Sequence, residues 1–193
     1  MGNGGAAARR PPIERGTLIA TRPILIYGAR LLRQRAEAVS GDLAALRPLV
    51  DDMFETMYAE PGIGLAAPQI GVSKRLVVID AVPEEDGSET LAPKLVLVNP
   101  EITWFSSDRV PYEEGCLSVP DILETVERPR AIRFRYTDLE GRSLERDTAG
   151  LLARVVQHEV DHLNGILFID RVSLVKKQFL RKKLRQLADT SRA

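Results

Sequence analysis

The only two histidines of the chain lie four residues apart, in the segment His158-Glu159-Val160-Asp161-His162. A spacing of i and i+4 places both imidazoles on one face of a helix, one turn apart. Apolar residues at helical spacing precede the motif and predict a helix over about 149–163, which ends at Asn164-Gly165. This H-E-x-x-H pattern is typical of hydrolases in which two histidines bind an ion and the glutamate is the general base.

The motif alone does not identify the third ligand to such an ion. A catalytic site needs three protein ligands and one open position. No histidine remains, so the third ligand is either Cys116, the only cysteine, or a carboxylate. Metallopeptidases take theirs downstream, where only Asp170 and Asp189 are available. A lone cysteine is most often a small buried apolar residue, but Gly115 and the polar residues 112–114 before it favour a site.

Strand-like segments occupy the middle of the chain and helical segments lie towards its ends, which predicts an α+β fold. A helix is expected from Asp42 to about Pro61-Gly62, with Pro48 causing a kink or a late start. Extended segments are expected at 24–27, 76–79, 95–98, 102–105 and 131–136, with a hairpin turn at 138–141. The last helix, about 173–187, is expected to present its apolar residues on one side: Val175, Phe179, Leu180, Leu184 and Leu187.

The composition fits one catalytic domain over residues 21–193. The chain has 193 residues, of which 44% are hydrophobic, enough for a substantial core. Residues 1–20 are rich in Gly, Ala, Arg and Pro and are expected to be a disordered extension, and 83–93 looks like an inserted loop. The balance of 27 basic and 27 acidic residues predicts no DNA partner. No apolar run approaches the roughly 20 residues that span a bilayer, so we expect no membrane association.

Three segments together resemble the peptide deformylase family. They are GIGLAAPQIG at 62–71, EGCLS at 114–118 and QHEVDH at 157–162, and their order and separations match the family as well. The similarity covers about residues 22–187. It implies small antiparallel or mixed sheets packed around a central H-E-x-x-H helix, followed by a C-terminal helix.

The resemblance also implies how the site works. One divalent ion is bound, natively Fe²⁺, with Zn²⁺, Ni²⁺ or Co²⁺ as alternatives, and its implied ligands are Cys116, His158 and His162. Glu159 is implied as general base and acid. Gln69 and the backbone N–H of Leu117 are implied to stabilise the oxyanion. The implied reaction removes the formyl group from the N-terminal formyl-methionine of new polypeptides and releases formate.

Substrate contacts follow from the same resemblance. Gly64 and Glu114 are implied to hold the site and the substrate backbone. A pocket for a methionine-like side chain is implied for three further residues: Ile63, Leu151 and Val155. Arg154 departs from the apolar residue expected if its position lined that pocket, and Leu123 stands where some relatives carry an arginine.

The segment from Arg171 to Arg185 contains seven basic residues and no acid. It is either a solvated helix face or a contact with ribosomal RNA, and the resemblance favours the ribosome. We expect a cytoplasmic protein, with an organelle as the alternative. Three rival functions remain: another H-E-x-x-H metallopeptidase, a ribosome-associated module without catalysis, and a cysteine hydrolase that uses Cys116.

Overall fold

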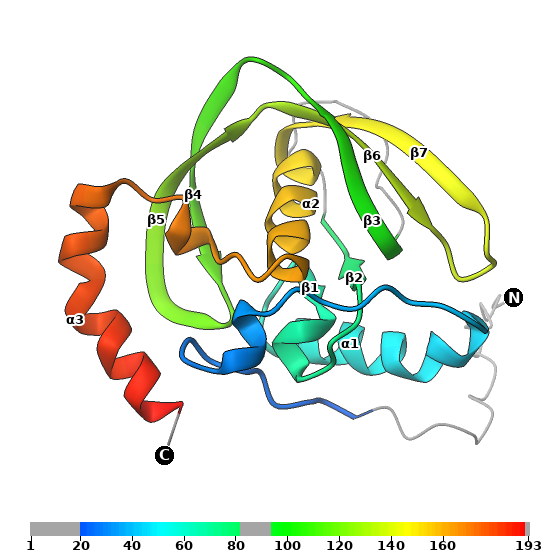
Figure 1. The fold of residues 1–193 in the computed structure, drawn as a ribbon, viewed down its shortest axis with the longest axis horizontal. Helices are drawn as coiled ribbons and strands as arrows, with labels where there is room; N and C mark the ends of the chain where they lie inside the picture. Colours follow the sequence, from blue (N-terminus) through cyan, green and yellow to red (C-terminus); the bar gives the residue numbers. More distant parts are fainter. Residues whose placement is uncertain (1–19, 82–93, 192–193) are drawn as a thin grey trace, which may run out of the picture.

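The computed structural model describes residues 20–81 and 94–191. A five-stranded sheet and a two-stranded sheet lie on either side of a central helix, α2 (Figure 1). The helices are α1 (Arg47–Ala59), α2 (Gly150–Leu163) and α3 (Leu174–Thr190), with short 3-10 helices η1 (Arg30–Arg33), η2 (Ala44–Leu46), η3 (Ala67–Ile70) and η4 (Phe168–Asp170). The strands are β1 (Gly64–Ala66), β2 (Leu76–Ile79), β3 (Leu95–Phe105), β4 (Arg109–Cys116), β5 (Val119–Pro129), β6 (Ala131–Thr137) and β7 (Ser143–Ala149).

The larger sheet has the strand order β1-β2-β3-β6-β7, and every pair in it is antiparallel. Strand β2 lies between two helices, so both of its faces are buried. Val77 and Ile79 join the cluster formed with α2, whereas Leu76 and Val78 join the cluster formed with α1. This division follows from the two-residue period of a strand. The α+β class and the central H-E-x-x-H helix predicted from the sequence are confirmed.

The second sheet is the antiparallel pair β4 and β5, which arches beside α2. Apolar residues of β5 pack against the segment around η4 and against α3. This hairpin is important for the site because β4 ends at Cys116. It carries the chain back towards the N-terminal loop, where the backbone N–H of Tyr27 donates to the carbonyl of Ser118 over 2.8 Å.

The prediction that α3 has one apolar face is wrong. Leu180, Leu184 and Leu187 pack against the β5 cluster, but Val175 and Phe179 are 64% and 82% exposed. Residues on a helix are separated by about 100°, so the first three share a side that Val175 and Phe179 do not. The packed side is therefore set by the leucines alone.

Other elements agree closely with the sequence. Pro48 lies in the first turn of α1, which starts late at Arg47 behind η2, and strand β2 has the predicted bounds. The two strands expected at 95–98 and 102–105 form one strand, β3, with irregular register against β6. The segment 24–27 belongs to no described strand: it is irregular and ends in a turn at Tyr27-Gly28. The expectation for residues 1–20, apart from Ala20, and the expectation for the loop 83–93 lie outside the described residues.

Strands β4, β5 and β7 were not predicted. Their sequences mix charged residues with few apolar ones, and β4 and β5 also contain prolines, so no run of alternating hydrophobicity marks them. Partners along the chain stabilise them: β4 and β5 form a hairpin, and β7 pairs with β6 from Ala131–Ala149 to Thr137–Ser143. Across 20–81 and 94–191, no helix has both the length and the apolar character needed to cross a bilayer.

Candidate metal centre and active site

Helix α2 brings the two histidines together as their spacing predicted. The ring centroids of His158 and His162 lie 5.1 Å apart. His162 is only 1% exposed, and Glu159 between them is 4% exposed. Burial, reinforced by the charge of His158, holds the pKa of His162 well below its usual range. A neutral imidazole is the form that binds a metal ion.

Cys116 reaches this pair from the end of β4. Its Sγ atom lies 3.2 Å from Nε2 of His162, although 46 residues separate the two along the chain. One donor atom from each of Cys116, His158 and His162 falls within 4.8 Å of the others, and these are the one group of potential metal ligands among the described residues. A thiol with two imidazoles is a donor set that Zn²⁺ and related transition metals accept. The residues therefore fit a divalent ion.

Gln69 enters the site from η3. Its Oε1 atom accepts a hydrogen bond from the backbone N–H of Ala66 at 2.8 Å, which orients the amide. Its Nε2 atom then points to Cys116 Sγ at 3.7 Å and to Ser118 Oγ at 3.3 Å. Leu117 directly follows Cys116, at the turn between β4 and β5. The structure thus brings the side-chain amide of Gln69 beside Cys116. The backbone amide of Leu117 is next to Cys116 in the chain.

Gly64 lets β1 approach the catalytic helix closely. A Cβ atom at this position would lie 2.6 Å from Oε1 of Glu159 and 2.9 Å from a methyl carbon of Val155. Both distances are shorter than real side-chain contacts, so a side chain at Gly64 would displace the glutamate. The need for a small residue in GIGLAAPQIG is therefore steric at this position.

Glu159 is the buried carboxylate of this site. Burial raises its pKa to about 7, against the opposing charges of His158 and Arg128. Its Oε2 atom is buried and has no hydrogen-bond partner among the described residues, as is also true of Nδ1 of His162. Burying a carboxylate oxygen without a hydrogen-bond partner destabilises the fold, so such a group in a native structure calls for an explanation, and a catalytic role is one.

Glu114 is held by four contacts behind the histidines. It accepts from Arg128 Nε at 2.7 Å and Nη2 at 3.0 Å, and from Arg154 Nη1 at 2.6 Å. Its Oε2 atom lies 3.1 Å from Nδ1 of His158. Burial alone would raise the pKa of Glu114, but hydrogen bonds from His158 and Arg128 outweigh it and hold that pKa well below its usual range. Glu114 is therefore an anion, and it orients the imidazole of His158.

The sequence analysis missed Arg128 and the role of Arg154. Arg128 is 2% exposed and also donates to Asp161, which Arg171 contacts too. Arg154 is 8% exposed and turns towards Glu114 and the carbonyls of Val110 and Val126. A signal for Arg128 existed, because it shares the strand parity of buried Val126 and Ile122.

The remaining residues that were predicted to contact the substrate differ in their burial and in their distance from the metal centre. Val155 is buried against Gly64, as described above. Ile63 adjoins Gly64 and is 44% exposed, a rim position. Leu151 lies one turn before Val155 and packs on the core of the larger sheet. Leu123 is exposed, and its Cδ2 atom covers Gly115, where a Cβ would approach it to 2.8 Å.

Comparisons with known proteins decide the family. The family model described as polypeptide deformylase matches residues 21–178. This chain belongs to the polypeptide deformylase family. A peptide deformylase of Phenylobacterium zucineum is 48% identical over 170 residues, which are 88% of this chain and 98% of the relative.

Solved peptide deformylases share the fold of this deformylase. One from Legionella pneumophila has a TM-score of 0.76 at 44% identity and covers 86% of this chain and 95% of its own. A class I type b enzyme from Acinetobacter baumannii, with Met-Ala-Ser bound, has a TM-score of 0.75 at 40% identity and covers 80% of this chain and all of its own.

Membership establishes the reaction. This deformylase is an enzyme that removes the N-terminal formyl group from nascent polypeptides, and the family is metal-dependent. The readings as another metallopeptidase, as a non-catalytic module and as a cysteine hydrolase are not favoured. The short distance between Cys116 and His162 does not by itself favour a cysteine hydrolase, because an ion bound by both residues explains it equally well.

Proposed function

We propose that Cys116, His158 and His162 hold the metal ion of this deformylase, and that Fe²⁺ is the native ion. Zn²⁺, Ni²⁺ and Co²⁺ suit the same donors, because a thiolate with two imidazoles accepts borderline-soft divalent ions. Residues 21–193 are proposed as a single catalytic domain. When bound, the ion supplies Lewis acidity that lowers the pKa of water towards about 7, so a nucleophile is available at neutral pH.

Glu159 is proposed as the general base and acid. The observation that carries this role is its buried Oε2 atom, which has no partner in the described chain, on a residue that directly follows His158 in α2. An unpaired carboxylate there can accept a proton from the attacking water. It then delivers that proton to the nitrogen that leaves with the peptide, so the amine departs neutral and formate is released.

Gln69 and the backbone N–H of Leu117 are proposed to donate hydrogen bonds to the oxyanion. Gln69 is preorganised for this, because the N–H of Ala66 fixes its Oε1 atom and leaves its Nε2 atom towards the site. Donors that are already oriented stabilise developing charge without further reorganisation.

Replacing Gln69 with alanine is expected to lower kcat about 10²–10³-fold, the usual loss for one oxyanion donor. Metal content should stay unchanged, because no proposed ligand is altered. Steady-state formate release and metal analysis measure the two effects. Gln178→Ala, an exposed amide on α3, is the control. A Gln69→Ala enzyme within twofold of the wild type would remove Gln69 from the mechanism.

The substrate side chain is proposed to lie near Gly64 and Val155, with Ile63 at the rim and Leu151 one turn before Val155 on α2. The close approach of β1 to α2 at Gly64 supports this placement. The Acinetobacter baumannii relative binds Met-Ala-Ser, which supports a methionine-like side chain as the occupant. Glu114 is proposed to act through His158 and not on the substrate, since its contacts are internal.

The ligand assignment is tested by loading the protein with Fe²⁺ without oxygen and counting metal per chain. Cys116→Ala is expected to lose most of the bound metal and to release no formate from formyl-Met-Ala-Ser, because one of three ligands is gone. Glu159→Gln is the control, which should keep its metal. Full metal content in Cys116→Ala would show that the third ligand is another residue.

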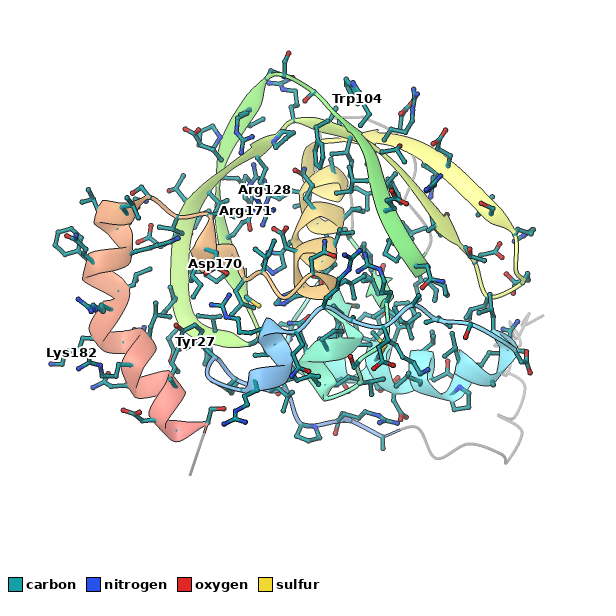
Figure 2. The ribbon with its side chains drawn as sticks, viewed as in Figure 1. Tyr27, Trp104, Arg128, Asp170, Arg171 and Lys182 are labelled. Carbon is teal, nitrogen blue, oxygen red and sulfur yellow. The ribbon has the colours of Figure 1, made fainter. Side chains whose placement is uncertain are left out.

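Contact with the ribosome through the basic helix is proposed for α3, in a cytoplasmic enzyme. Arg181 and Lys182 are exposed on this helix, and the side chain of Lys182 points away from the body of the molecule (Figure 2). Basic residues without a carboxylate partner suit the phosphates of RNA. The neighbouring Lys176 has such a partner, Glu124, at 2.6 Å.

Arg181→Glu/Lys182→Glu is expected to weaken ribosome co-sedimentation at least tenfold at low salt. The reason is that the change reverses two charges and leaves the leucines that pack α3 in place. Arg133→Glu/Arg146→Glu, on β6 and β7, carries the same change of charge and should sediment like the wild type. Equal binding by all three proteins would exclude α3 as the contact.

A further inference from the structure

A cavity of about 740 Å³ lies beside α2 and is not assigned to catalysis. From the helix it is lined by Gln157, Val160, Asp161 and Asn164. Residues on a helix turn by about 100° each, so these four lie on the side opposite to His158, Glu159 and His162. Its volume falls within the roughly 300–1,000 Å³ of ligand sites. The cavity is therefore large enough for a ligand and separate from the metal centre.

The cavity has more positive than negative charge. Its lining includes five arginines, Arg35, Arg75, Arg109, Arg128 and Arg171, and two acids, Glu101 and Asp161. Both acids already have partners. Arg128 and Arg171 donate to Asp161 over 2.7 and 2.6 Å, and Arg135 donates to Glu101 over 2.7 Å. Arg35, Arg75 and Arg109 have no carboxylate partner within the described chain.

Arg75 is fixed in place by neutral acceptors. Its guanidinium donates to the carbonyls of Leu163 and Pro100, each over 3.2 Å, and to Oδ1 of Asn164 over 3.0 Å. Burial lowers the pKa of Arg75, and the nearby charge of Arg35 lowers it further, although Glu101 opposes both. The positive charges of Arg35 and Arg75 lie close together, and Arg75 is held between β3 and α2, so this part of the cavity favours an anion. Phosphate is a suitable anion, because the planar guanidinium of arginine can donate two parallel hydrogen bonds to it.

An exposed aromatic ring lies at the far end of the same cavity. Phe105 lines it and is 50% exposed. Arg75 contacts Pro100, five residues before Phe105 along β3, so the two ends are on the order of 15 Å apart. Arg109 follows Phe105 by four residues in the chain and supplies a guanidinium at this end of the cavity.

We propose that this cavity binds a short single-stranded segment of RNA. Phosphates would lie on Arg35 and Arg75 at one end and on Arg109 at the other, with a base stacked on Phe105. Arginines with exposed aromatics are the usual elements of single-strand binding. The separation of the charged ends is greater than one nucleotide spans, which favours a chain over a mononucleotide. The nascent peptides that this enzyme processes are made beside RNA.

The proposal is tested by fluorescence anisotropy of 5′-labelled octauridylate with the metal-loaded, full-length enzyme. Arg35→Glu/Arg109→Glu changes two exposed residues and is expected to weaken binding at least tenfold and to reduce the salt slope. Phe105→Ala should weaken it at least about fivefold, the lower end for one base–aromatic stack. Formate release from formyl-Met-Ala-Ser should be unchanged in both variants, which shows that they fold.

Two controls locate the site. Arg133→Glu/Arg146→Glu makes the same change of charge at two residues that do not line the cavity, and it should bind RNA within twofold of the wild type. Arg181→Glu/Lys182→Glu makes the same change of charge on α3 and should also bind the octamer within twofold of the wild type. The proposal is overturned if the wild type does not bind at low salt, or if the cavity variants bind like the wild type. It is also overturned if only the α3 variant loses binding, or if uridine monophosphate competes as well as the octamer.

Discussion

Glu159→Gln is expected to lower kcat/KM for formate release from formyl-Met-Ala-Ser by about 10²–10⁴-fold, the usual contribution of a general acid–base group. Glutamine keeps the shape of the side chain but cannot accept the proton of the attacking water. Because burial already favours the neutral form of Glu159, a neutral amide should fit the site without loss of stability. The packing against Gly64 should also be kept.

The measurement needs metal content beside activity, because loss of the ion would mimic loss of the base. Glu159→Gln should retain about one metal per chain and remain folded. Glu127→Gln, an exposed carboxylate on β5, is the control and should leave activity within twofold. A fully metallated Glu159→Gln enzyme with near wild-type activity would show that another group transfers the proton.

Arg128→Met is expected to destabilise the enzyme by about 3 kcal/mol, the lower end of the 3–5 kcal/mol found when one partner of a buried ion pair is removed. Arg128 is 3% exposed at its side chain and neutralises Glu114 and Asp161, which are equally buried. We expect the lower end because Arg154 still contacts Glu114 and Arg171 still contacts Asp161. Metal affinity should fall about 10–100-fold as well, since Glu114 orients His158.

Urea denaturation of the Arg128→Met protein, with and without the ion, separates these two effects. Arg133→Met is the matched control: its ion pair with Asp147 is exposed, at 49% and 66%, and such pairs contribute about 0–1 kcal/mol. An Arg128→Met protein no less stable than Arg133→Met would mean that the remaining arginines compensate fully. In that case Arg128 would not be needed to hold Glu114 against His158.

Much of the active site was predictable because its signals are local. Two histidines four residues apart must share one face of a helix, whatever surrounds it, and Glu159 must lie beside them. The bounds of β2 were equally local, since a run of four apolar residues buried on both faces needs no partner to be recognised. The proposal of Cys116 as the third donor came from the resemblance, because 46 residues separate it from His162 and no local pattern joins them.

The long-range features depend on strand pairing and on burial, which no local pattern records. Strands β4, β5 and β7 carry mixed polar sequences and exist because each has a neighbour to pair with. The side of α3 that packs was mispredicted, because it depends on which leucines meet β5. Arg128 and Arg154 read as surface residues, yet the fold buries them against Glu114 from two different elements. The spacing of residues along the chain specified the chemistry of the helix, whereas the charges that support it depend on contacts between distant segments.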